Sequence, residues 1–238
     1  CNGFIVFIMM LHNFFRNIKN SNILVNDKCF AQILKLNYCK KEDRQSESCN
    51  GNSITELIRH NFHSECEEGL NEQINCELYA SYAYFCMSNC MSRPDVALLG
   101  FANFFLNASR EEQKHAQMLV DFVNKRGGTV QLCDVLKPDP GDFHNPETAL
   151  EESILLEKHV LKNIEELHKK SVRHNDMFLQ DFLEAHMIPE QYDGLQQLGE
   201  MLANVRRAGS GVGVVLLDRD LLRYPVKSHG SSKDEKLD

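Results

Sequence analysis

Apolar residues recur at steps of three and four along residues 98–126, and this spacing predicts an amphipathic helix. One face of the helix mixes apolar side chains with two ionisable ones. In chain order, that face carries Phe101, Phe105, Ala108, Glu112, His115, Leu119 and Phe122. The pattern therefore directs a carboxylate and an imidazole, one turn apart, at the interior of the protein.

The same helical period recurs along most of the chain. Four long runs and a shorter apolar piece, "VGVVLLDRDLL", cover residues 63–92, 98–126, 146–174, 176–208 and 212–222. Pro94 is expected to stop the first run, Gly127 the second and Gly209 the fourth, because proline and glycine break helices. A long connection, residues 131–149, carries three prolines. The sequence thus predicts an all-α four-helix bundle in up, down, down, up order, with one long crossover and a short fifth helix.

Each long run places a group that can bind metal on its apolar face. The face of the fourth run is Glu184, Ile188, Gln191, Leu195 and Leu198. The candidate residues of the four runs, in chain order, are Glu77 with Tyr84, Glu112 with His115, Glu157, and Gln191. Each one alone would be read as surface decoration, a buried ion pair or ordinary packing. Their joint occurrence, one set per helix, favours a shared site.

The energetics of burial favour a metal at that site. Even after relaxation, an ionised carboxylate costs several kcal/mol to bury, and a whole domain is stable by only about 5 to 15 kcal/mol. One or two bound divalent cations would neutralise three carboxylates that converge in one core. Oxygen-rich ligation with one imidazole and no thiolate favours iron or manganese over copper, and a cysteine-rich zinc site is excluded.

Composition and charge narrow the classes of partner. The chain has 238 residues, 42% of them apolar and 25% charged, with a formal net charge of -8. Residues 1–52 carry seven basic and four acidic residues, so the rest of the chain is markedly acidic. An acidic core argues against nucleic acid and suits assembly or cation handling. The nine cysteines include no C-x-x-C pair, and they are expected to be reduced thiols.

We expect three segments along the chain. Residues 1–52 form an extension that could be a leader, a fragment or mis-assigned coding sequence, residues 53–222 form the bundle with its fifth helix, and residues 223–238 form a polar tail. The apolar stretch 4–11 is too short to span a bilayer. A cytoplasmic protein with no membrane partner is expected, or an organellar or secreted one if residues 1–52 are a genuine leader.

Four segments of the chain resemble those typical of animal ferritin. They are "QINCELYASYAY" (73–84), "SREEQKHA" (109–116), "RGGTVQLCDVLKPD" (126–139) and "LEKHVLKNIEELHK" (156–169). The similarity runs from about residue 61 to about residue 222. It implies a hollow shell of 24 subunits, homomeric or mixed, that oxidises Fe(II) with dioxygen and stores the ferric product as a mineral.

The resemblance also implies a role for each candidate residue. Glu77 and His115 match ligands of the first iron of a di-iron centre, and Glu112 matches the carboxylate that bridges the two irons. Glu157 matches the ligand of the second iron, while Gln191 and Tyr84 match hydrogen-bonding partners of the site. This complete set is similar to that of catalytic, heavy-chain-type subunits, with iron as substrate and no organic cofactor.

Further residues match the family's route for iron. The pair Asp181 and Glu184, with His168 nearby, matches the lining of the three-fold channels, although an acidic helix face in solvent would look the same. Glu111 matches a residue of mineral nucleation, whereas Lys114 and Gln117 stand where carboxylates are common. The short fifth helix matches the element around the four-fold axes, with Val212, Leu216 and Asp220 on its facing side.

Two departures and two alternatives accompany the resemblance. Pro189 lies inside the fourth run, two residues before Gln191, and is expected to remove a hydrogen bond and kink the axis. Gly194 stands where a symmetric di-iron bundle would carry a second histidine. A mainly structural shell subunit with impaired oxidation is therefore the alternative. A di-iron oxygenase acting on an organic substrate is disfavoured, because no wide apolar access pocket is indicated.

Overall fold

The structure is a computed structural model, and it describes residues 54–139 and 143–224. Every regular element in these residues is helical. In chain order the elements are α3 (Ile54–Ile58), α4 (Ser64–Met91), α5 (Leu99–Lys125), α6 (Pro146–Arg173), α7 (Met177–Phe182), the π-helical turn η1 (Leu183–Met187), α8 (Ile188–Ala208) and α9 (Val212–Arg223). The predicted all-α class is confirmed, and the short helix α3 was not expected.

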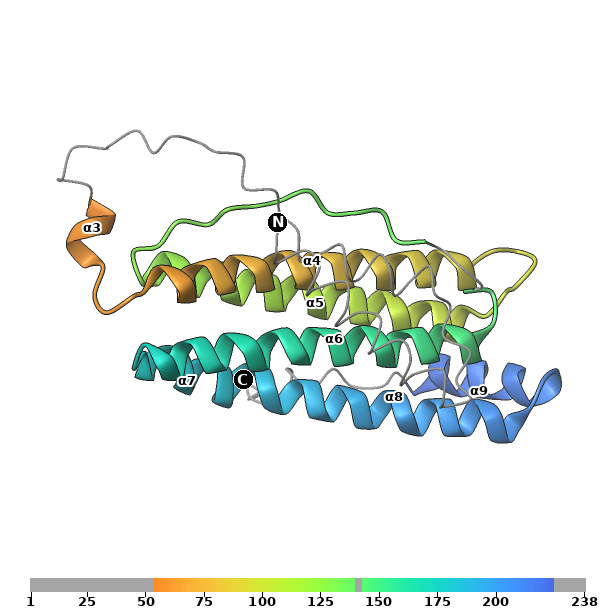
Figure 1. The fold of residues 1–238 in the computed structure, drawn as a ribbon. Helices are drawn as coiled ribbons and strands as arrows, with labels where there is room; N and C mark the ends of the chain where they lie inside the picture. Colours follow the sequence, from red (N-terminus) through yellow and green to blue (C-terminus); the bar gives the residue numbers. More distant parts are fainter. Residues whose placement is uncertain (1–53, 140–142, 225–238) are drawn as a thin grey trace, which may run out of the picture.

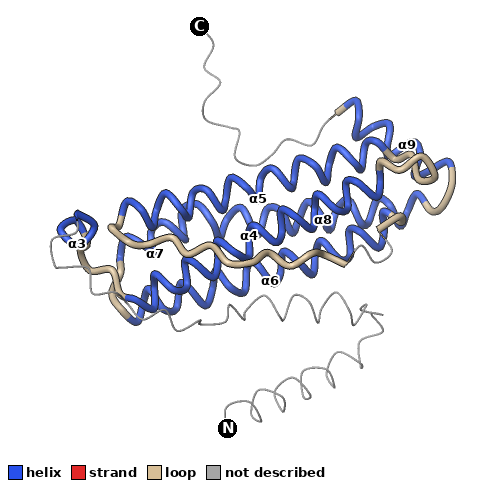
Figure 2. Tube along the Cα trace, turned by 90° about the horizontal axis from the view of Figure 1, so that it is seen from above, coloured by secondary structure: helices blue, strands red, loops and turns tan. Residues whose placement is uncertain are grey.

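The long helices form one bundle in the predicted order. Helices α4 and α5 run side by side in opposite directions, and the crossover then returns along the length of the bundle (Figures 1 and 2). Helix α6 consequently runs parallel to α5, so the residue after α5, Arg126, can bond to Asp176, which follows α6. Helix α8 runs back along α6. The up, down, down, up arrangement is therefore confirmed.

Local sequence explains where these helices begin and end. Asn145 caps α6 by accepting a hydrogen bond from the backbone N–H of Glu147, and Pro146 occupies the first turn, where a missing N–H has no consequence. Lys170 and Arg173 lie in the last turn of α6, where they complement the helix dipole. Gly127, the second residue after α5, has a φ of 69°, so the predicted glycine stop is confirmed.

Most of the side chains buried in the bundle interior are apolar. Leu70, Ile74, Phe105 and Ile164 are fully buried where the helices meet. The start of the crossover is tied to α4, because the backbone N–H of Gln131 donates to the Asn71 side chain at 2.7 Å.

The fourth run does not form the single predicted helix 176–208. It is divided into α7, η1 and α8, and the backbone N–H of Ile188 donates to the carbonyl of Leu183, five residues back. Pro189 is the physical reason, since its ring and missing N–H do not fit a regular helix interior. The extra residue in this turn also changes the register of the faces before and after it. Glu184 is accordingly exposed, at 61%, and the prediction that it shares the apolar face is wrong.

Helix α9 docks on the beginning of α5 through one carboxylate. Oδ1 of Asp218 accepts hydrogen bonds from the backbone N–H groups of Gly100 at 2.7 Å and Phe101 at 3.0 Å. A Cβ at position 100 would lie 2.0 Å from the Asp218 carbonyl oxygen, so only glycine allows this approach. Val212 and Leu216 are exposed on α9.

The remaining expectations concern cysteines, membranes and termini. Cys66, Cys76, Cys86 and Cys90 are free, as expected. Cys133 is disulfide-bonded, so the expectation of a reduced thiol is wrong there. None of the described helices has both the length and the apolar character that crossing a bilayer requires. The extension 1–52 and all but the first two residues of the tail lie outside the described residues.

Candidate metal centre

Helix α4 brings Glu77 and Tyr84 into the middle of the bundle. The two residues are seven positions apart, close to two full helical turns, so both point inward. Glu77 is completely buried and Tyr84 is 2% exposed. Nε2 of Gln73, one turn before Glu77, donates a hydrogen bond of 2.6 Å to Glu77 Oε1.

Helix α5 supplies a carboxylate and an imidazole to the same place. Glu112 is buried, and its Oε2 lies 3.2 Å from Nδ1 of His115, three residues later on the same face. One ligand atom each of Glu77, Glu112 and His115 lies within 4.8 Å of the other two. The structure thus brings together three of the candidate ligands in a single cluster.

Glu157 of α6 is joined by hydrogen bonds to Tyr84 of α4 and Gln191 of α8. The Tyr84 hydroxyl donates to Glu157 Oε1, and the Gln191 side chain also hydrogen-bonds the Glu157 carboxylate. Both Glu157 and Gln191 are buried. Glu157 is not one of the three residues whose ligand atoms meet within 4.8 Å, so the site has two unequal halves.

Two oxygen atoms of the site lack a hydrogen-bond donor. Oε2 of Glu77 and Oε1 of Gln191 are buried without a partner. Buried polar atoms are rarely left in this condition, because each costs about 1 to 3 kcal/mol. Carboxylate and amide oxygens beside one imidazole are suitable ligands for a divalent ion such as Fe(II), so the residues present fit a metal.

The electrostatics of the buried carboxyl groups also favour a cation at this site. Burial raises the pKa of Glu77 well above its ordinary value, and the nearby Glu112 carboxylate adds to the effect. Burial also raises the pKa of Glu112, and it raises the pKa of Glu157 to about 7. Without a cation the three carboxyl groups therefore hold protons more tightly than usual. A bound metal would take the place of those protons.

The imidazole of His115 is held between two carboxylates. Burial lowers the pKa of His115, but hydrogen bonds with Glu112 and Glu190 outweigh it and raise the pKa to about 12. Nε2 of His115 lies 3.0 Å from Oε2 of Glu190 on α8. Sequence reasoning missed Glu190, although its position next to Gln191 on the same helix could have indicated it.

A cleft of about 780 Å³ adjoins the site. It is lined by site residues from all four helices, and Glu111, Lys114 and Glu190 also border it. Lys114 is exposed and Glu111 is half-buried, so the cleft continues from the buried carboxylates toward the surface. A second hollow, of about 540 Å³, lies between α8 and α9 and includes none of the candidate ligands.

The predicted channel residues lie away from the buried site. Nε2 of His168 is 2.6 Å from Oε1 of Glu184, so these two side chains are brought together, and Asp181 is exposed one turn earlier. Gln117, expected near the nucleation residues, is exposed and donates to Asp121 on the same helix. These positions are compatible with roles at a surface shared between subunits.

Comparison with known proteins matches the part of the chain that forms the site. The family described as "Ferritin-like domain" matches residues 67–208, which include all six residues discussed above. Soma ferritin of Lymnaea stagnalis is 41% identical over 164 residues, which are 69% of this chain and 94% of that protein.

Proposed function

Because the chain belongs to the ferritin family, whose function is iron storage in multi-subunit shells, we propose that it is a catalytic, heavy-chain-type subunit. It oxidises Fe(II) to Fe(III) with dioxygen at a di-iron centre inside the subunit and releases the ferric product into the shell cavity. Each Fe(II) loses one electron, and dioxygen accepts the electrons. Iron is thus the substrate and the stored product.

One observation carries this proposal. The carboxylates of Glu77 and Glu112 and the imidazole of His115 lie together in the bundle interior, and the fully buried Oε2 of Glu77 has no donor. The buried carboxylate of Glu157 is linked to the same site through Tyr84. Glu77 and His115 would hold the first iron, Glu112 would bridge to the second, and Glu157 would hold the second. Tyr84 and Gln191 orient Glu157 through their hydrogen bonds. Such orienting partners commonly change metal affinity or activity about 10- to 100-fold.

Aerobic oxidation of Fe(II) by the assembled protein tests the proposal. Glu112→Ala should slow oxidation at least about 100-fold, since loss of a bridging ligand exceeds the effect of losing an orienting partner. Glu166→Ala is the matched control, because Glu166 is an exposed glutamate that pairs with Lys169 on the surface. Equal rates for Glu112→Ala and the wild type would refute the oxidation site. Slow oxidation by the wild type itself would favour the alternative, a mainly structural shell subunit.

The unequal halves of the site bear on product release. Gln191 and Gly194 stand where a symmetric centre would have glutamate and histidine, so the second iron has fewer strong ligands. We infer that this asymmetry lets oxidised iron leave toward the cavity. A Cβ at Gly194 would meet nothing within 4 Å, so a side chain can be introduced there. The double variant Gln191→Glu, Gly194→His should retain two irons per subunit and turn over slowly, and unchanged turnover would contradict the inference.

The proposal includes a route by which iron reaches the site. In a shell, three copies of Asp181 and Glu184, with His168 beside Glu184, would form an acidic ring that concentrates cations. Substituting both acidic residues by alanine should leave the shell assembled but slow iron uptake. Equal uptake rates would argue against the ring. Glu111 near the cleft is the proposed nucleation residue, with reduced efficiency beside Lys114 and Gln117.

The proposed function also includes the assembly of the subunits into a shell and the location of the protein in the cell. A 24-subunit shell, homomeric or mixed, would cover the exposed apolar side chains Val212 and Leu216 of α9, with Asp220 on the same helix. Light scattering would separate a shell of this size from a monomer. A cytoplasmic location stays a prediction, and mass spectrometry of the natural amino terminus would test it together with the fate of residues 1–52.

A further inference from the structure

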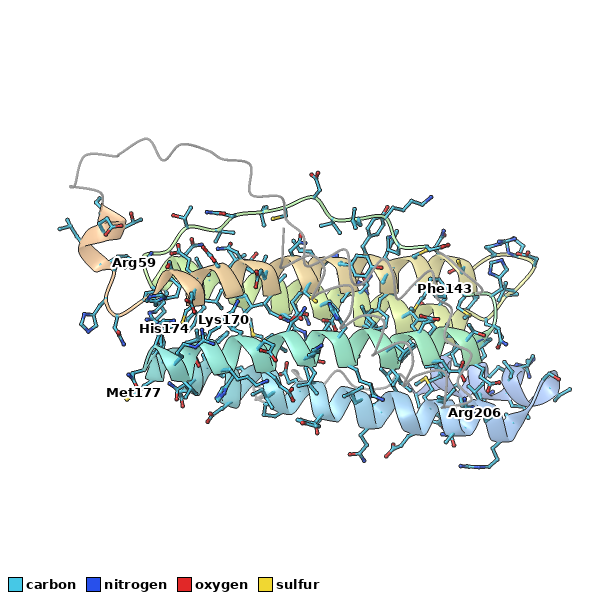
Figure 3. All side chains as sticks on the ribbon, in the orientation of Figure 1. Arg59, Phe143, Lys170, His174, Met177 and Arg206 are labelled. Carbon is cyan, nitrogen blue, oxygen red and sulfur yellow. The ribbon has the colours of Figure 1, made fainter. Side chains whose placement is uncertain are left out.

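A carboxylate of α8 contacts the imidazole of the candidate metal centre. Nε2 of His115 lies 3.0 Å from Oε2 of Glu190, and the two side chains are 16% and 30% exposed. Glu190 lies in the first turn of α8, at the end of that helix away from Arg206, which Figure 3 labels. The contact joins α5 to α8 at the site, although Glu190 is not one of the proposed iron ligands.

The two ring nitrogens of His115 face different carboxylates. Nδ1 lies 3.2 Å from Oε2 of Glu112, whereas Nε2 faces Glu190. Glu112 belongs with Glu77 to the cluster of possible metal ligands, so Nδ1 is the ring nitrogen on the metal side. An imidazole that binds an ion through one nitrogen carries its hydrogen on the other. In this arrangement that hydrogen lies on Nε2, against Glu190.

A carboxylate is a suitable partner for that hydrogen, because an ionised carboxylate can only accept. Histidines that bind metals commonly donate their second N–H to a carboxylate or a carbonyl group. This bond fixes the tautomer and the orientation of the ring, and it makes the other nitrogen a stronger ligand. The contact between Nε2 and Glu190 has the length of an ordinary hydrogen bond. Glu190 therefore meets the geometric requirement for orienting His115.

The next residue of α8 makes the equivalent contact in the other half of the site. Gln191 hydrogen-bonds the carboxylate of Glu157 on α6. Two consecutive residues of α8 thus contact candidate ligands on two different helices. Both follow Pro189 in the first turn of α8, where the proline ring fixes φ and no N–H is required. The beginning of α8 therefore supports the ligands of both halves.

We propose that Glu190 is a positioning residue for the first iron. It accepts the Nε2 hydrogen of His115 and holds the ring so that Nδ1 faces the iron, an inference that rests on the proposed di-iron centre. Glu190 is not a ligand of that iron, because it contacts the other nitrogen of the ring. Loss of its carboxylate should therefore weaken metal binding without changing the set of ligands.

Anaerobic binding of Co²⁺ to the assembled protein tests the inference without iron oxidation. Imidazole and carboxylate ligands suit Co²⁺, and its visible absorption depends on the ligands that it has. The part of the absorption that is lost in His115→Ala defines the site. Glu190→Ala should weaken Co²⁺ binding there about 10- to 100-fold, with the same absorption at saturation. Glu200→Ala is the matched control, because Glu200 is an exposed glutamate of the same helix that accepts from Gln196.

A second variant, Glu190→Gln, separates the hydrogen bond from the negative charge. Its amide oxygen can still accept from Nε2 of His115, so it should recover most of the affinity that Glu190→Ala loses. Unchanged affinity in Glu190→Ala, or equal weakness of the two variants, would overturn the positioning role. A different absorption at saturation would also overturn it, because Glu190 would then be a ligand. If the wild type binds no Co²⁺ that depends on His115, the proposed metal centre itself fails, and this inference fails with it.

Discussion

Two buried charged clusters in this chain are built in opposite ways. At one end of the bundle, Arg126 and Asp176 are 9% and 2% exposed and form two parallel hydrogen bonds of 2.8 and 2.9 Å. Asp176 also accepts from the backbone N–H of Leu179, so its carboxylate is fully used. In the middle of the bundle, no lysine or arginine among the described residues forms an ion pair with Glu77, Glu112 or Glu157.

This difference shows that burial alone does not identify a functional carboxylate. Asp176 is as deeply buried as Glu77, yet its partners are complete and its role is to join α5 to the start of α7. Glu77 keeps one oxygen without a donor. What marks the proposed metal centre is therefore bonding capacity that the protein itself does not satisfy.

The largest expected effect on stability concerns the buried ion pair of Arg126 and Asp176. Arg126→Ala leaves the Asp176 carboxylate buried without its partner and removes a guanidinium that also lies over the ring of Phe62. The free energy of unfolding should fall by about 3 to 5 kcal/mol. Chemical denaturation of the metal-free protein would measure it, with the exposed Arg207→Ala as control. A loss below about 1 kcal/mol would contradict the structural role given to this pair.

The next largest effect concerns how the stability of the metal-free protein depends on pH through Glu157, one of the buried carboxylates in the middle of the bundle. The pKa of Glu157 is raised from 4.5 to about 7, so the native metal-free protein holds this proton more tightly than the unfolded chain does. Its contribution to stability is complete below about pH 4.5 and is lost as the pH rises to 7, a change of about 3 kcal/mol. Denaturation of wild type and Glu157→Gln at several pH values isolates it. Parallel curves for the two proteins would show that Glu157 is not responsible.

A third prediction examines a buried carboxylate completed by backbone groups. Asp218→Ala removes the acceptor of two N–H groups at the start of α5, where Leu98 offers no side-chain cap. Stability should fall by about 1 to 2 kcal/mol, as for the loss of a helix cap. Hydrogen exchange should show faster exchange at Gly100 and Phe101. Unaltered exchange at these two amides would mean that the cap contributes nothing.

The smallest expected effect is a gain in stability rather than a loss. Glu77→Gln replaces a buried carboxyl group, whose pKa is raised, by an amide that does not titrate, so the metal-free variant should gain about 1 kcal/mol over the wild type as the pH rises. The gain should vanish at low pH, because the Glu77 carboxyl is then protonated in both the folded and the unfolded chain. Fe(II) oxidation should be lost in the same variant. A destabilised metal-free protein would place Glu77 with Asp176 as a structural residue.

The sequence alone predicts the features that depend on the local spacing of apolar residues. The four long runs and their stops follow from repeats of three and four and from glycine or proline. The structure has one helix for each of the first three runs, whereas the fourth is divided into α7, η1 and α8. The candidate ligands could be found because each interrupts an apolar face with a polar group. The cluster of Glu77, Glu112 and His115 follows directly from those faces once the helices pack.

Other features depend on contacts that no local pattern reveals. The turn η1 is one extra residue in an otherwise periodic run, so the register change that exposes Glu184 was not predicted. The contact of Glu190 with His115 depends on how α8 packs against α5. His63 and His174 are brought together by the antiparallel course of α4 and α6, far apart in the sequence.

The carboxylate of Asp218 imposes an order on the folding of this chain during its synthesis. The residue that completes the first turn of α5 follows Gly100 by 118 positions. While the polypeptide grows on the ribosome, the first turn of α5 must wait for almost the entire described region to leave the exit tunnel. Premature termination before the codon for Asp218 would therefore yield a nascent product in which the first turn of α5 lacks its cap.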